Sequence, residues 1–518
     1  MKTKTKGLIV AGFFAVILLT STLTLALNSS PNQQPPTEAT ITGTPADNFP
    51  DLDRPKFCST GDAKSNTYVT EYKIPTDCTQ PLAITLDDSG MVYFAQTNTG
   101  KIAKFDPSTE QFTEYENPDW PQGARSMIWG IDYSNGNVWY TDDSFNSIWK
   151  FSTLDGTYTR IAFPTKEDSL PQRLEIFGNK IIVNDFYESK ISIFDTTQTT
   201  ENKIYTNIPS PLPGSFVGGF EVDNSGNIWY TNWMLRQGGA LVKFDYTELS
   251  EFIATNPAQN VTVSEFSQVY DLPASIGAPN GLSADKHGNL WVVDTISSSF
   301  YKFSESSGTF TKYTTPDSPV STYGNVTGVI KIPVTQPYWS EIQGDKLFFN
   351  EQAANALAVF DIENESLVEY LVPSQNPNWG DCGDKSECGI AQVFGFQIAQ
   401  DTIWFTEWVE NNIGKVDLGK PLTTTLSVSN KQVTIPRGQT MPIEIIVNTN
   451  TDTKILSKTT SDFSDIIVKI PNTTISNSQS IPLSIVTSPS ALPGVYKVVL
   501  SARTADVTVS EFITVTIQ

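Results

Sequence analysis

Histidine and cationic side chains are scarce in this sequence. It contains one histidine in 518 residues, and 34 Lys and Arg stand against 56 Asp and Glu, which gives a formal net charge of −22. This acidic balance excludes nucleic acid and anionic lipid as partners of the soluble part of the chain. Charged residues make up 17% of the sequence and hydrophobic residues 39%. These fractions exclude a disordered polyelectrolyte and a long charged coiled coil, and they suffice for substantial cores.

Cysteine is also rare, with four residues at Cys58, Cys78, Cys382 and Cys388. One histidine cannot complete the mixed Cys/His ligand sets of zinc sites, and Cys-x5-Cys is not the tight spacing that zinc favours. Four cysteines in an oxidising compartment can pair in three ways. We prefer a short-loop disulfide between Cys382 and Cys388, which leaves Cys58 to pair with Cys78.

One long apolar run lies near the N-terminus. Residues 7–27 carry no charge and follow three lysines. Such a run is long enough to cross a bilayer, and its positive flank holds the N-terminus in the cytoplasm. We therefore expect a membrane-anchoring helix over 1–27, a flexible linker over 28–57, and an extracytoplasmic remainder. A cleaved signal segment ending near Thr24 and Ala26, and hence a secreted protein, is the alternative.

Asparagine acceptors for glycosylation agree with export. Asn-x-Ser/Thr sequences occur in turn-like or polar segments. These are candidate glycan sites on the outer face, and their asparagines are Asn260, Asn325, Asn364 and Asn472.

Aromatic and β-branched residues, by contrast, are plentiful and favour strands separated by turns. One module recurs seven times: a turn with Gly, Asn or Asp precedes a strand with an aromatic or aliphatic centre and a polar last residue. The seven strands cover residues 91–96, 137–142, 180–185, 227–232, 289–294, 346–351 and 402–407.

Each of these strands is followed by another that ends in Phe-Asp or a variant, and a further strand closes six of the units. After the seventh unit, at Val416 and Asp417, no closing strand follows, but Tyr68 to Pro75 repeats its pattern before the first unit. A ring that takes this segment into its last unit leaves no open sheet edge. The repeat therefore predicts an all-β fold, a seven-bladed β-propeller over 58–420 that is closed by its N-terminal strand.

The last hundred residues differ from the repeat. Trp and Cys are absent after Pro421, and alternating apolar runs take over. Short alternating strands in a segment of this length are typical of an immunoglobulin-like β-sandwich. We expect this domain over 421–518.

The polar last residues of the seven repeated strands are candidate site residues. In a propeller these strand ends meet the blade-to-blade connections on one face, around the channel mouth. Carboxylates that converge there would attract a divalent cation such as calcium or magnesium, and Asp294, Glu351 and Glu407 are the best candidate metal ligands. The alternative is that each residue only satisfies its own turn. The full set is Gln96, Asp142, Asp185, Asn232, Asp294, Glu351 and Glu407, to which we add Asn280.

Three stretches carry a family resemblance: Asn280-Gly281-Leu282, Gly288-Asn289-Leu290-Trp291, and Trp404 to Glu407 with Asn412-Ile413-Gly414-Lys415. The module resembles the repeat of the virginiamycin B (streptogramin B) lyase family over residues 65–420. The resemblance implies a propeller fold. It also implies a lyase that opens a cyclic depsipeptide ester by elimination, with a histidine as acid and base and with glutamates that hold a divalent metal.

The chain departs from that family at the histidine. His287 lies in a turn that we place on the opposite face of the ring, and the positions that align with the family histidine hold Asn280 and Val393. We therefore expect the fold of the family without its chemistry. Pro279-Asn280-Gly281 with Val293-Asp294-Thr295 resembles, more weakly, the metal-binding blades of gluconolactonase and senescence-marker propellers.

These observations predict an extracytoplasmic, membrane-tethered propeller that binds an unidentified small molecule, glycan or envelope protein at the channel mouth. The first alternative is an enzyme, a divalent-metal-dependent lyase or lactone hydrolase. The second is a structural component of the cell envelope.

Overall fold

The computed structural model describes residue 58 and residues 61–163, 169–197, 205–212, 214–234, 238–256, 263–320, 334–376, 389–461 and 464–518. These residues form strands almost throughout, with one α-helix, α3 (Tyr246–Thr255), and one 3-10 helix, η4 (Val263–Phe266). In this part of the chain no helix has the length and apolar character needed to span a membrane. The predicted anchor over 1–27 and linker over 28–57 lie outside the described residues.

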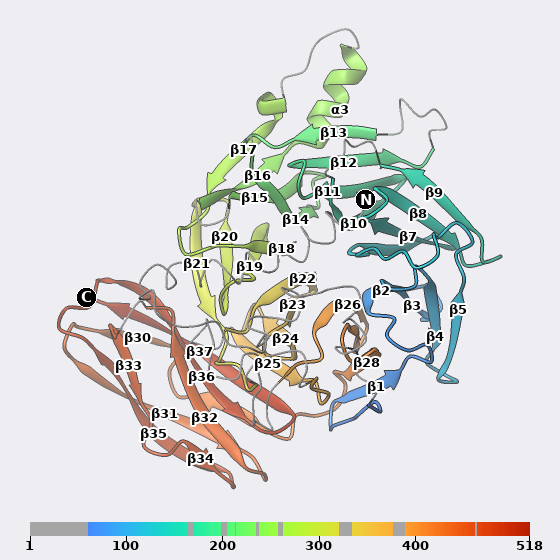
Figure 1. Ribbon diagram of the computed structural model, residues 1–518. Helices are drawn as coiled ribbons and strands as arrows, with labels where there is room; N and C mark the ends of the chain where they lie inside the picture. Colours follow the sequence, from blue (N-terminus) through green and yellow to red (C-terminus); the bar gives the residue numbers. More distant parts are fainter. Residues whose placement is uncertain are drawn as a thin grey trace, which may run out of the picture.

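Seven sets of four antiparallel strands follow one another around a ring (Figure 1). We number them as blades one to seven and give the strands of each from the axis outward. Blade one consists of β2 (Pro81–Leu86), β3 (Val92–Gln96), β4 (Ile102–Asp106) and β5 (Gln111–Tyr115). Blade two consists of β6 (Ile131–Ser134), β7 (Asn137–Asp142), β8 (Ser147–Ser152) and β9 (Tyr158–Ala162). Blade three consists of β10 (Pro171–Phe177), β11 (Lys180–Asp185), β12 (Lys190–Asp195) and β13 (Tyr205–Pro209).

The remaining blades follow the same order. Blades four to seven are β14 (Phe216–Val222), β15 (Ile228–Met234), β16 (Gly238–Phe244), β17 (Ser267–Asp271); β18 (Pro279–Ala284), β19 (Asn289–Asp294), β20 (Ser299–Ser304), β21 (Thr309–Thr314); β22 (Pro337–Gln343), β23 (Lys346–Glu351), β24 (Ala356–Asp361), β25 (Ser366–Leu371); and β26 (Val393–Ala399), β27 (Thr402–Glu407), β28 (Asn412–Asp417) with β1 (Val69–Lys73).

The N-terminal strand closes the ring as the sequence predicts. β1 runs antiparallel to β28, with Val69 opposite Val416 and Lys73 opposite Asn412. The first strand of blade seven, β26, in turn contacts β2 of blade one. The predicted propeller and its N-terminal closure are therefore confirmed.

Glycines let the first strands of neighbouring blades pack closely around the axis. A Cβ atom on Gly219 would lie 2.4 Å from the carbonyl oxygen of Asn280, and one on Gly395 would lie 2.3 Å from that of Leu82. No side chain fits in so small a gap, which explains the glycine at these two positions.

Aromatic side chains fill the space between the blades. Trp229 and Trp291, at the recurring strand position, are 1% exposed. Their indole N–H groups donate to the turn carboxylates of Asp223 (2.9 Å) and Asp285 (3.1 Å). The recurring tryptophans are therefore packing residues, each also satisfied by the turn of its own blade.

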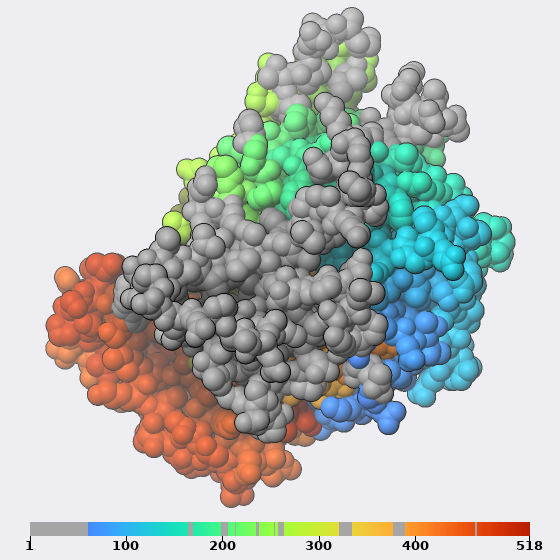
Figure 2. All heavy atoms as spheres, in the orientation of Figure 1, coloured from blue at the N-terminus to red at the C-terminus, as the bar shows by residue number. Residues whose placement is uncertain are grey.

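The chain after β28 forms two further sheets that share one hydrophobic core. This arrangement is a β-sandwich, and the space-filling view shows it along one side of the propeller (Figure 2). Its sheets are β29 (Thr425–Val428), β31 (Thr440–Asn448), β35 (Gln479–Thr487), β33 (Ile466–Lys469); and β30 (Gln432–Ile435), β37 (Val507–Ile517), β36 (Gly494–Arg503), β32 (Thr453–Thr459), β34 (Thr474–Ile475).

The sandwich is continuous with blade six. β37 pairs antiparallel with β25, so that the blade and one sandwich sheet form a single nine-stranded sheet. Phe512 of β37 packs on Tyr313 and Phe360, with ring centroids 5.5 and 5.6 Å apart. Lys497 makes an ion pair of 2.6 Å with Glu365 of blade six. The propeller and the sandwich are therefore held by strand pairing, apolar packing and charge.

One predicted disulfide is present, and several predicted sites lie elsewhere in the chain. Cys58 is bonded to Cys78, as predicted. Asn364 and Asn472 are exposed. The predicted Cys382–Cys388 pair and the acceptors Asn260 and Asn325 lie outside the described residues.

Candidate functional site

The seven predicted strand-end residues do not form an open ring at the channel mouth. Each of these residues is 0% exposed, and their role as ligand contacts stays a prediction. The seven are Gln96, Asp142, Asp185, Asn232, Asp294, Glu351 and Glu407.

The connection that leads into the same blade folds back over the strand end and explains this burial. The Asp294 carboxylate accepts N–H bonds from Gly277 (3.1 Å) and Ala278 (2.8 Å), just before β18. Asp185 accepts one from Leu170 (3.0 Å), just before β10. These side chains fix the entry of their own blades, which was the alternative interpretation of the pattern.

Asn280 is the eighth predicted residue and lies near the start of β18. Its amide donates to the Thr295 hydroxyl (2.8 Å), and the side chain is partly buried. It therefore links the first strand of blade five to the end of the second.

Three blades pair the strand-end residue with a glutamate from the outermost strand. In blade one the Gln96 amide donates to the Glu114 carboxylate at 2.7 Å. In blades six and seven both partners are acids, Glu351 with Glu369 and Glu407 with Glu71. The third-strand residue opposite each outer glutamate is small. These small residues are Ala103, Ala358 and Gly414.

The acid pairs have raised pKa values. Burial, and then the negative charge of Glu351, raise the pKa of Glu369 well above its usual range. Burial, and then Glu71, do the same to the pKa of Glu407. Neighbouring buried carboxylates disfavour the ionisation of one another, so each pair favours a retained proton more than an isolated carboxyl group does.

Asp294, Glu351 and Glu407 were predicted to share a divalent cation. The structure instead gives each a partner within its own blade. Across the described ranges, no group of three or more His, Cys, Asp and Glu side chains is placed to hold a metal ion.

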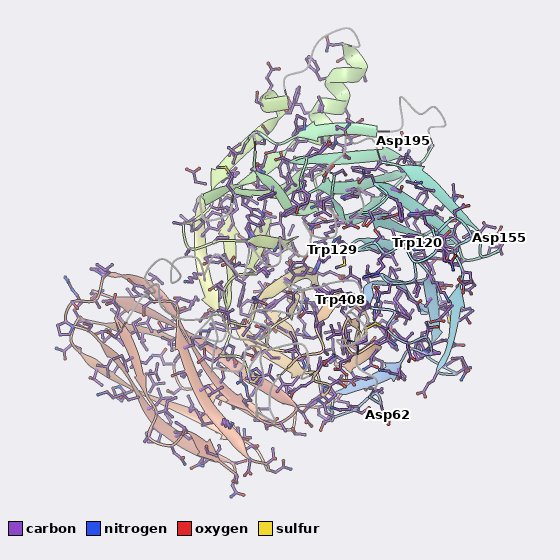
Figure 3. All side chains as sticks on the ribbon, in the orientation of Figure 1. Asp62, Trp120, Trp129, Asp155, Asp195 and Trp408 are labelled. Carbon is purple, nitrogen blue, oxygen red and sulfur yellow. A yellow bond between two sulfur atoms is a disulfide. The ribbon has the colours of Figure 1, made fainter. Side chains whose placement is uncertain are left out.

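A cavity of about 320 Å³ lies on the axis of the ring, and residues from the first strands of all seven blades line it. Six of these strands carry a register shift, which redirects side chains at the start of the strand. Trp129 and Trp408 lie toward the centre of the ring, whereas Trp120 lies out among the blades (Figure 3). Trp129 and Trp408 belong to an apolar cluster with Tyr338 and Phe394.

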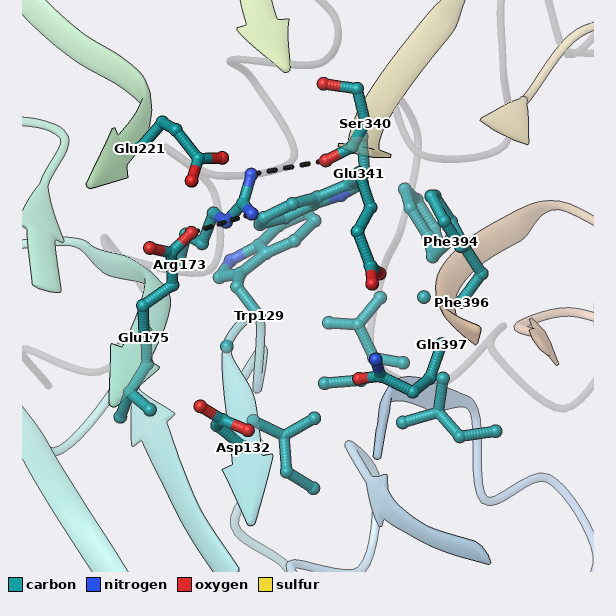
Figure 4. A pocket seen from close by; sticks show the side chains of 18 of the residues that line it. Trp129, Asp132, Arg173, Glu175, Glu221, Ser340, Glu341, Phe394, Phe396 and Gln397 are labelled. Carbon is teal, nitrogen blue, oxygen red and sulfur yellow. Dashed lines mark hydrogen bonds and ion pairs between the residues drawn. The ribbon is translucent and has the colours of Figure 1, made fainter. Parts of the chain in front are cut away.

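Arg173 is the cation of the cavity. Its guanidinium makes an ion pair with Glu175 (2.7 Å) and donates to the carbonyl oxygen of Ser340 (3.5 Å), as Figure 4 shows. It also lies 5.9 Å from the ring centroid of Trp339. The first strands of most other blades have Gly or Ala where β10 and β22 carry Arg173 and Trp339, so these two side chains fill the space on the axis.

Four carboxyl groups surround this single cation: Asp132, Glu175, Glu221 and Glu341. Burial raises the pKa of Asp132 and of Glu175. Burial, and then the charge of Glu175, raise the pKa of Glu221 well above its usual range. Burial raises the pKa of Glu341 to about 7, against the opposing effect of Arg173. The cavity thus concentrates acids with raised pKa values, as ligand and active sites often do.

The sequence analysis missed this cluster, although a signal was present. In every blade a polar first-strand residue lies opposite the recurring central residue of the second strand. A polar residue that recurs at a first-strand position where an apolar residue is expected indicates a side chain that faces the axis of the ring. The seven are Thr85, Asp132, Glu175, Glu221, Ser283, Glu341 and Gln397.

His287 lies away from the cavity. It occupies the turn between β18 and β19, is 54% exposed, and its Nε2 lies 3.0 Å from Glu363. It does not line the cavity, so the only histidine of the chain takes no part in this site.

No family model matches the chain, and the comparison with curated proteins found no match. Its fold is similar to that of virginiamycin B (streptogramin B) lyase propellers. A streptogramin B lyase structure is 21% identical and has a TM-score of 0.51; the match covers 68% of this chain and 97% of that one. A catalytically inactive virginiamycin B lyase from Staphylococcus aureus with quinupristin is 20% identical and has a TM-score of 0.50, over 69% of this chain and 100% of that one. At this identity the likeness supports the propeller fold alone.

Proposed function

We propose that this chain is an extracytoplasmic ligand-binding propeller that holds a small molecule in its axial cavity. The cavity itself carries the proposal. Its volume of about 320 Å³ is in the range of small-molecule sites, and it combines aromatic walls with a few convergent charged groups. One of the lyase propellers of similar fold was solved with a small molecule, quinupristin.

The location and the domain assignment belong to the same proposal. The uncharged run over 7–27 supports a membrane tether, with a cleaved signal as the alternative. The Cys58–Cys78 disulfide supports an oxidising compartment. We further propose that the C-terminal sandwich is of the immunoglobulin-like class, since its short strands alternate in polarity.

An enzyme is the second candidate, and one observation favours it. The pKa of Glu341 is about 7, which suits a general acid or base at neutral pH. This candidate covers the lyase and lactone hydrolase classes, with Glu341 in place of the histidine of the lyase family. Turnover of cyclic esters or lactones that is lost in Glu341→Gln would favour it over binding alone.

The binding proposal is tested by a thermal-shift screen of small molecules against the purified full chain. We expect hits whose stabilisation is lost in Trp339→Ala, because this variant removes a wall of the cavity. Phe177→Ala is the matched control, since Phe177 is 56% exposed and lies outside the cavity. Hits that Trp339→Ala retains in full would place the ligand elsewhere and overturn the proposal.

A further inference from the structure

The charges of the axial cavity are unbalanced. Four carboxyl groups face one guanidinium, and Arg173 is already paired with Glu175 at 2.7 Å. The Asp132 carboxylate accepts backbone N–H bonds from Tyr133 (2.7 Å) and Ile176 (3.0 Å). Glu221 and Glu341 make no ion pair with Arg173 within the described ranges, and the one guanidinium cannot balance all four carboxyl groups.

Glu341 is the group most available to a ligand. Its carboxylate makes no hydrogen bond or ion pair within the described ranges, and the charges that act on it are those of Arg173, Glu175 and Asp132. Figure 4 shows its side chain reaching into the open part of the cavity, between Asp132 and Phe394. A partly buried carboxylate without a donor is costly, so a donor that carries positive charge would be bound favourably.

The walls fit the same class of ligand. Trp129, Trp339 and Phe394 line the cavity, and aromatic faces attract alkylammonium groups. An anionic ligand would meet Asp132, Glu221 and Glu341 and be repelled.

We propose that the axial cavity binds a small organic cation with at least one protonated amino group, held by Glu341 and Glu221 across from Arg173. This inference rests on the proposed function and names its ligand class. The ammonium donates to the Glu341 carboxylate, and its alkyl part lies against the aromatic wall.

The affinity for such a cation should depend on pH. A cation binds the ionised form of Glu341, and the ionised fraction rises as the pH passes through about 7. The other acids that face it, Asp132, Glu175 and Glu221, have pKa values raised in the same direction. An alkyl amine stays protonated over this range. Affinity should therefore rise between pH 6 and pH 8, by up to about tenfold.

Titration calorimetry with three four-carbon probes tests the inference on the full chain: 1,4-diaminobutane, 1,4-butanediol and succinate. We expect binding of the diamine alone. Glu341→Gln should weaken it about tenfold and flatten its pH dependence. Glu363→Gln is the control from the same blade, because Glu363 is 53% exposed and lies outside the cavity. Glu341→Asp, which keeps the charge, should retain part of the affinity if Glu341→Gln fails to fold.

Tighter binding of the diol or of succinate than of the diamine would overturn the proposal of a cationic ligand. It would favour a polyol or an anion as the ligand. Diamine binding that Glu341→Gln leaves unchanged would also overturn it, since the cation would then lie elsewhere. If all three probes fail while the screen yields hits that depend on Trp339, only the ligand class is wrong. If no such hit exists either, the proposed function fails as well.

Discussion

Glu341 carries a conflict between burial and charge that a single substitution can relieve. Its pKa of about 7 in the folded protein lies above the value near 4.5 of the unfolded chain. Stability contributed by this group is complete below the unfolded pKa and is lost as the pH rises toward about 7. The ionised form is the one that folding disfavours.

We therefore expect Glu341→Gln to stabilise the ligand-free protein at pH 8 and to have little effect at pH 4. The gain at pH 8 should be on the order of 1–3 kcal/mol, given the partial exposure of the side chain. Urea unfolding of both proteins at the two pH values measures it. A variant less stable than the parent at pH 8 would mean that the carboxylate has a partner that compensates its charge.

Equivalent positions in different blades carry different side chains, so one blade can serve as the control for another. Blade one places an amide against a carboxylate, Gln96 with Glu114, whereas blade six places Glu351 against Glu369. Only the second pair must retain a proton to remain buried. It therefore loses stability as the pH rises above the unfolded value, because the folded pKa of Glu369 is raised.

Substitutions that exchange the amide–carboxyl pair and the carboxyl–carboxyl pair between the two blades test this pH dependence. Glu351→Gln should reproduce the blade-one pair, flatten the pH dependence of stability between pH 5 and pH 9, and add about 1–3 kcal/mol at the alkaline end. Gln96→Glu should do the reverse in blade one and introduce a new alkaline loss. Thermal melts across this pH range provide the readout, and parallel pH profiles for parent and variants would contradict the shared proton.

The strands were predictable because each blade repeats the same local signals. A turn with Gly, Asn or Asp, a strand with an aromatic or aliphatic centre and a polar strand end recur seven times, and the absent last strand identifies Tyr68 to Pro75 as the closing segment. The site was not predictable by the same means. Whether the Asp294 side chain faces the channel mouth or its own blade depends on the path of the chain at Gly277 and Ala278. No local sequence pattern predicts that path.

The axial cluster escaped prediction for a related reason. Arg173 and Trp339 stand where most blades have Gly or Ala, and a repeat search treats such departures as noise. They reach the axis because the first strands are bulged, a feature set by tertiary packing. The pairing of β37 with β25 was also beyond the sequence, because both strands read as ordinary amphipathic segments.

At the scale of the whole molecule, the sandwich and the propeller share a core and should unfold together. Phe512→Ala removes an aromatic side chain packed on Tyr313 and Phe360. We expect it to lower the free energy of unfolding by about 3–5 kcal/mol. Tryptophan fluorescence reports only the propeller in this experiment, since residues 421–518 contain no Trp. A propeller transition that Phe512→Ala leaves unmoved would show that the two parts unfold independently.

The segment just before β1 contacts both blade six and the sandwich. The Asn66 amide donates to the carbonyl oxygen of Leu371 (2.7 Å), and the backbone N–H of Thr67 donates to Asp506 of the sandwich (3.2 Å). Because the Cys58–Cys78 disulfide joins the two flanks of β1, a pull applied between Cys58 and Gln518 would load the disulfide, the start of blade one and β37 rather than the hydrogen bonds of β1. Blades two to five would carry no part of this load. The cavity residues on these blades, Asp132, Arg173, Glu175 and Glu221, would therefore keep their positions under the applied force.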